Sequence, residues 1–74
     1  MAPLDLSELA RQVIADQYPY FQRKQQSIEL VSAPCIIEGN NFTLTTLLKN
    51  LLSNASKYTP VHGHIKVLVE KFDD

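Results

Sequence analysis

The chain has 74 residues, a net charge of −1 at pH 7 and an isoelectric point near 6.0. This length allows one small domain, and the balanced charge provides no basic surface for nucleic acid or an anionic membrane. The single cysteine, Cys35, cannot form an internal disulfide, which favours a reducing compartment. The sequence therefore predicts one small domain that does not bind nucleic acid.

The first predicted element is a helix that begins at a capping motif. Asp5 occupies the N-cap position and Glu8 can reach back to it, while Leu4 and Leu9 form a hydrophobic staple. Pro19 removes a backbone donor, so we expect a kink there or an early end of the helix. The apolar residues that recur at helical spacing are Leu6, Leu9, Ala10, Val13, Ile14 and Phe21.

Two short strands are predicted next. Residues 27–32 are rich in aliphatic side chains and predict a strand, and residues 35–37 predict a second, shorter one after Pro34. Cys35 has no charged neighbour in the sequence, so we expect it to be buried rather than reactive.

A second helix and a third strand follow. Asn40 or Asn41 is the expected N-cap of a helix over residues 41–58, which Thr59-Pro60 ends. Residues 64–69 alternate between apolar and polar side chains and predict a strand that reaches Phe72.

The predicted order is α-β-β-α-β, which is typical of an α+β domain. Residues 1–4 are interpreted as a start and a spacer, and residues 5–74 as part of a domain. The sequence stops after the last strand without a closing helix, so we expect a piece of a longer protein.

The second predicted helix has two different sides. Asn50, Asn54 and Lys57 recur at i, i+4 and i+7 as a narrow polar stripe, and Tyr58 lies between this stripe and the apolar side. Asparagine costs about a few tenths of a kcal/mol per helical position relative to leucine or glutamate, so two of them one turn apart require an explanation. The residues expected to pack against the sheet are Leu44, Leu47, Leu48, Leu51, Leu52 and Ala55.

The stripe has the chemistry of a magnesium and phosphate site. An amide oxygen is a hard, neutral ligand suited to Mg²⁺, and the amide NH₂ can donate to a phosphate oxygen. Lys57 adds a positive charge for phosphates, and Tyr58 an aromatic face or hydroxyl for a base. In the simpler alternative, Asn50 and Asn54 are structural amides or surface residues, and Lys57 compensates the helix dipole. The spacing alone leaves both interpretations open.

The stretch LLKNLLSNASKYTP, residues 47–60, resembles the N box of sensor histidine kinases. VHGHIKVLV resembles the turn and strand that follow it, and LDLSELARQVIADQYPYFQRKQQSIELV the opening helix and strand of the same domain. IIEGN resembles the short strand and turn before the N-box helix, although Asn40 replaces the usual aspartate. The resemblance covers the chain after Ala2. It implies a partial two-layer α/β sandwich of the histidine-kinase ATPase (Bergerat) type, with the N-box helix at about 41–58.

The resemblance also implies a role for each residue of the stripe and for Tyr58. Asn54 matches the asparagine that coordinates Mg²⁺, and Asn50 matches the one that supports the metal and phosphates. Lys57 matches a phosphate contact, and Tyr58 lines the adenine site. The parent protein is then an ATP- and Mg²⁺-dependent protein-histidine kinase, with this part in the cytoplasm below an inner-membrane anchor. Its expected partners are a dimerisation and phosphoacceptor domain and a response regulator.

Several motifs of that family are missing from the sequence. The aspartate-glycine motif D-x-G-x-G and the later glycine motifs are absent, and so is the phosphoacceptor box. His62 and His64 flank Gly63 in a turn, and we expect them to be exposed and not to bind metal. The sequence thus ends before the G1 box and contains no catalytic residue, so we expect this chain alone to be inactive. We also expect it to self-associate, or to swap elements with another copy, through uncovered sheet surface.

Two alternatives remain open. The first is a non-catalytic, kinase-like module that binds a partner protein and no nucleotide. The second is a piece of an ATPase related to gyrase, or of an anti-sigma serine kinase. Those ATPases place a glutamate general base one turn before the metal-binding asparagine, where this chain has Asn50, which cannot accept a proton from water. This difference favours a kinase.

Overall fold

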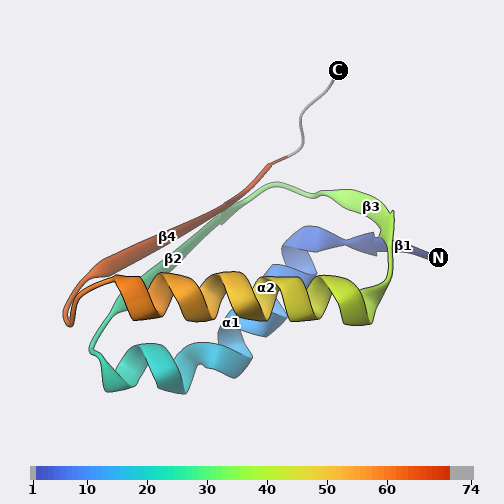
Figure 1. Cartoon of the computed structure of the whole chain (residues 1–74). Helices are drawn as coiled ribbons and strands as arrows, with labels where there is room; N and C mark the ends of the chain where they lie inside the picture. Colours follow the sequence, from blue (N-terminus) through green and yellow to red (C-terminus); the bar gives the residue numbers. More distant parts are fainter. Residues whose placement is uncertain (1, 71–74) are drawn as a thin grey trace.

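The computed structural model describes residues 2–70 and contains two helices and four strands, with the α+β fold class that the sequence predicts. Both helices lie on one side of the longer strand pair. The shorter strand pair lies beside the N-terminal ends of the two helices (Figure 1). In chain order the elements are β1 (Ala2–Asp5), α1 (Leu6–Arg23), β2 (Ser27–Ser32), β3 (Ile36–Gly39), α2 (Asn41–Tyr58) and β4 (His64–Val69). β4 ends at Val69, and the predicted end at Phe72 lies outside the described residues.

The strand β1 was not predicted, and the interpretation of residues 1–4 as a spacer is wrong for the part that the structure describes. β1 pairs antiparallel with β3, with Leu4 opposite Ile37. The cause is the extended backbone that Asp5 adopts as the N-cap of α1, which directs the preceding residues along β3. The amide of Leu6 also donates to the carbonyl of Cys35 at 2.8 Å. The observed order is therefore β-α-β-β-α-β.

The strands form two separate two-stranded sheets. β2 and β4 pair in parallel, from Ser27 opposite His64 to Ser32 opposite Val69. A parallel pair needs a long crossover connection, and here α2 lies within that crossover. α2 is thereby held over the sheet that β2 and β4 form.

Both helix starts follow the predicted caps. The Asp5 carboxylate accepts a hydrogen bond from the amide of Ser7 at 2.9 Å, and the Asn40 side chain accepts one from Thr43 at 3.0 Å. Glu8 pairs with Arg11, and so its side chain binds within the helix rather than at the cap. Of the two outcomes expected at Pro19, a kink or an early end, the early end is wrong, since α1 continues past Pro19 to Arg23.

The core lies between the two helices and the β2–β4 sheet. One cluster of buried side chains consists of Val13, Phe21, Leu52 and Ile65, and a second consists of Ala10, Cys35 and Val69. Cys35 is buried, as expected. The expectation that Leu47 and Leu51 pack in the core is wrong, because they are 51% and 55% exposed. On a helical wheel both leucines lie on the apolar side of α2, but no element among residues 2–70 packs against that part of the helix surface.

Candidate functional site

The three residues of the polar stripe and the neighbouring Tyr58 lie exposed on the C-terminal half of α2. Successive helical residues are about 100° apart, so Asn50, Asn54 and Lys57 share one edge of the helix. The Nζ atom of Lys57 lies 5.6 Å from the centroid of the Tyr58 ring, and Tyr58 is 76% exposed. Asn50 and Asn54 are exposed as well, so neither amide belongs to the buried core. A surface role and a ligand-binding role remain.

Two side chains from the segment after α1 hold the end of α2 in place. The buried Gln26 amide donates to the carbonyls of Ser56 at 2.9 Å and Thr59 at 2.8 Å, and its oxygen accepts from the Ser56 hydroxyl at 2.7 Å. Lys24 Nζ donates to the same two carbonyls, at 2.5 and 3.0 Å. The last carbonyls of a helix have no partner within the helix. Gln26 and Lys24 satisfy them and thereby fix the position of the turn that carries Lys57.

The sequence analysis assigned no role to Gln26 or Lys24. Both lie in a polar run after the first helix, which gives no sign that one member is buried. The only signal available was the position of this run, directly before a strand that pairs with the segment after α2.

The turn between α2 and β4 is tied to the same segment. The amide of His62 donates to the carbonyl of Lys24 at 3.0 Å, and the amide of Ser27 donates to the carbonyl of Gly63 at 3.0 Å. A Cβ atom at Gly63 would lie 2.8 Å from the carbonyl oxygen of Pro60 and 2.4 Å from Thr59. Only glycine fits there without a shift of the backbone.

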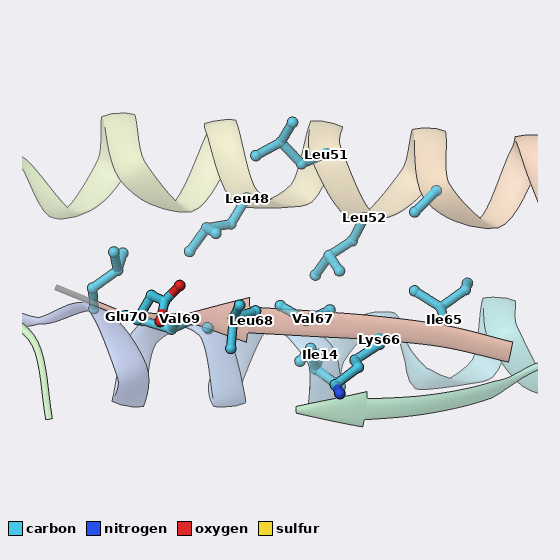
Figure 2. Close-up of a pocket in the computed structure, with 13 residues that line it drawn as sticks. Ile14, Leu48, Leu51, Leu52, Ile65, Lys66, Val67, Leu68, Val69 and Glu70 are labelled. Carbon is cyan, nitrogen blue, oxygen red and sulfur yellow. The ribbon is translucent and has the colours of Figure 1, made fainter. Parts of the chain in front are cut away.

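Two hollows flank the stripe. On one side a groove of about 320 Å³ runs between α2 and β4, where Figure 2 shows Leu48 and Leu52 pointing toward the strand. On the other side a more polar hollow lies between α1 and α2, and Arg23, Lys24 and Lys57 line it. Lys57 therefore borders one hollow, and the exposed Leu51 borders the other. By helical angle Asn54 lies between them.

The two histidines have the exposed positions that were expected. His64 lies on the open face of the β2–β4 sheet, with Nδ1 2.7 Å from the Ser27 hydroxyl and Nε2 3.3 Å from a Glu29 carboxylate oxygen. These contacts link neighbouring strands at the surface, and the three residues line neither hollow. Within residues 2–70, no three His, Cys, Asp or Glu side chains are grouped closely enough to hold a metal ion.

The α+β fold of residues 2–70 is similar to parts of two solved histidine kinase structures. The cytoplasmic segment of histidine kinase QseC aligns with a TM-score of 0.89 and 27% identity, over 93% of this chain and 47% of that chain. The mycobacterial sensor histidine kinase MprB aligns with a TM-score of 0.86 and 24% identity, over 97% of this chain and 47% of that chain. The fold is therefore histidine-kinase-like.

This chain spans about half the length of each of those two structures. No protein-family model matches the sequence, and no curated protein matches it closely enough to count as a relative. Neither helix among the described residues 2–70 is long and apolar enough to cross a membrane.

Proposed function

We propose that this chain is the first part of the ATP-binding catalytic domain of a sensor histidine kinase, and that α2 is its N-box helix. The observation that carries the proposal is the exposed edge of α2, where Asn50, Asn54 and Lys57 stand together without a role in the core. The histidine-kinase-like fold supports it, because the two histidine kinase structures align with 93% and 97% of this chain.

Each residue has a chemical role in this proposal. The amide oxygen of Asn54 binds Mg²⁺, and Asn50 supports the metal and the phosphates through its own amide. Lys57 provides a positive charge for the phosphates of ATP. Tyr58 presents its ring to the adenine. These assignments fit the exposed positions of all four side chains, and the neutral amides hold the metal without repelling the phosphates.

The residue at position 50 favours phosphoryl transfer over hydrolysis. A hydrolase needs a base that takes a proton from the attacking water, and an amide cannot take that proton. A bound γ-phosphate therefore survives until a nucleophile on a protein attacks it. In the proposal this nucleophile is a histidine of the dimerisation and phosphoacceptor domain, and a response regulator then receives the phosphate.

The location of the parent protein is part of the same proposal. One of the two similar structures is described as a cytoplasmic segment of its kinase. We place this chain on the cytoplasmic side of an inner-membrane sensor. Further segments of the parent complete the adenine pocket, and this chain alone is expected to be inactive.

The test is a titration of the ¹⁵N-labelled chain with Mg²⁺ and ADP, followed through amide chemical shifts. The expected result is a saturable shift of the amides of residues 50–58 that requires Mg²⁺ and is lost in Asn54→Ala. The matched control is Asn41→Ala, an exposed asparagine in the first turn of the same helix, which should leave the shifts intact.

The alternatives predict different results. A dispersed spectrum in which no amide moves with nucleotide would contradict the half-site proposal and favour the kinase-like interaction module. Shifts that persist in Asn54→Ala but vanish in Asn41→Ala would also contradict it, because binding would then lie at the start of α2. Hydrolysis of ATP by the chain would instead support the ATPase alternative.

A further inference from the structure

The proposed phosphate contact Lys57 lies at the end of α2 that is unfavourable for an anion. Lys57 is in the last turn of the helix, and Tyr58 is its last residue. The aligned peptide dipoles of a helix place about half a negative charge at its C-terminal end. Anions bind at the opposite, N-terminal end for the same reason. A phosphate beside Lys57 is therefore repelled by the backbone of its own helix unless another group offsets that charge.

The Lys24 ammonium lies on this end of the helix. Its Nζ atom donates to the carbonyls of Ser56 at 2.5 Å and of Thr59 at 3.0 Å. The carbonyl oxygen of Lys57 lies 3.5 Å from the same atom. Within residues 2–70, neither Lys24 nor Lys57 forms an ion pair with a carboxylate. In the described part of the chain, the negative charge nearest to Lys24 is therefore the C-terminal end of α2.

The hydrogen bonds of Lys24 duplicate those of a neutral side chain. The buried amide of Gln26 donates to the carbonyls of Ser56 and Thr59 at 2.9 and 2.8 Å. A carbonyl oxygen has two lone pairs, so it can accept from both side chains at once. These carbonyls at the helix end thus keep a hydrogen-bond donor even without Lys24. What Lys24 adds to the contact is its charge.

This charge lies beside the proposed phosphate site. Arg23, Lys24 and Lys57 all line the polar hollow between α1 and α2, and no carboxylate among residues 2–70 lines it. Three positive charges therefore surround a helix end that carries about half a negative charge. The net charge at this end of α2 favours an anion, although the helix alone would disfavour one.

We propose that Lys24 is a positioning residue of the nucleotide site, which does not touch the nucleotide and acts through the end of α2. Its ammonium offsets the negative end of the helix, so that Lys57 attracts the phosphates of a Mg²⁺-bound nucleotide with its full charge. Gln26 satisfies the same carbonyls without offsetting their charge. This inference rests on the proposed function, since it concerns the phosphates of the same nucleotide.

Three substitutions test this role in titrations of the ¹⁵N-labelled chain with Mg²⁺ and ADP. Lys24→Gln removes the charge and should weaken binding roughly threefold to tenfold at low salt. Lys24→Arg keeps the charge and should bind like the original chain. The matched control is Lys66→Gln. It removes the same charge from an exposed position on β4 whose side chain alternates with the core residue Ile65 and so points away from the helices. Its affinity should equal that of the original chain.

The salt dependence separates the charge of Lys24 from its hydrogen bonds. Dissolved ions screen charges, so the loss in Lys24→Gln should shrink as the salt concentration rises. A loss caused by a displaced helix end should instead persist. A loss that is the same at high salt, a failure of Lys24→Arg to restore the affinity, or an unchanged affinity in Lys24→Gln would overturn this inference while the proposed function stands.

Two further outcomes are decisive. Unfolding of Lys24→Gln would overturn the inference, because the ammonium would then be required by the fold. An original chain that binds no Mg²⁺ and ADP would overturn the proposed function and this inference together.

Discussion

The Gln26 side chain is hydrogen-bonded to Ser56 in two ways: its oxygen accepts from the hydroxyl at 2.7 Å, and its amide donates to the carbonyl at 2.9 Å. Thirty positions separate the two residues in sequence, and both are buried. This contact joins the segment that enters β2 to the last turn of α2. It therefore orients the turn that carries Lys57 and Tyr58 relative to the sheet.

The first prediction concerns this contact. Gln26→Ala leaves the buried Ser56 hydroxyl without its acceptor and leaves the helix-end carbonyls with Lys24 as their only side-chain donor among the described residues, and it should lower the free energy of unfolding by about 1–3 kcal/mol. Urea unfolding followed by circular dichroism measures this. Gln12→Ala removes an exposed glutamine from α1 and should change stability little. Equal effects of the two substitutions would show that the contact does not hold α2.

The second prediction concerns the main core cluster. Phe21 is 1% exposed and Phe42 is 80% exposed, so the two phenylalanines form a matched pair. Phe21→Ala leaves a cavity and should cost about 3–5 kcal/mol, a large share of the roughly 5–15 kcal/mol that holds a small protein folded. Phe42→Ala should be close to neutral. Thermal unfolding of both variants tests the position of the core, and similar losses would contradict it.

The third prediction concerns the turn before β4. Gly63→Ala brings a Cβ atom within 2.8 Å of a backbone oxygen, whereas Gly39→Ala brings one within 2.8 Å of the end of the Leu44 side chain. A side chain can rotate away more easily than a backbone can shift. We expect Gly63→Ala to destabilise by about 1–3 kcal/mol and Gly39→Ala by less. The reverse order in urea unfolding would show that the turn is looser than the structure indicates.

Local chemistry made the helices predictable. The N-cap residues Asp5 and Asn40 are both confirmed, because a short polar side chain before an apolar run satisfies a need of any helix start. The predicted bounds 41–58 match α2. β1 was missed, since its pairing with β3 depends on where two distant segments meet rather than on its own four residues.

The surroundings of α2 could not be predicted in the same way. A helical wheel assigns Leu47 and Leu51 to the apolar side, but it does not show which elements cover that side. Their exposure follows from the position of α2 over β2 and β4. Burial of Gln26 likewise depends on a carbonyl thirty positions away. The three residues of the stripe and Tyr58 were identified from the sequence, and their role as a site stays a prediction.

The central claim is that the exposed edge of α2 binds a metal together with phosphates, and Mn²⁺ in place of Mg²⁺ tests it most directly. Mn²⁺ broadens the signals of nearby amides. With ADP present, the account predicts selective broadening of the amides of residues 50–58, absence of that broadening without ADP, and its loss in Asn54→Ala. Broadening centred on exposed carboxylates such as Glu29 or Glu38, unchanged by ADP and by Asn54→Ala, would contradict the account.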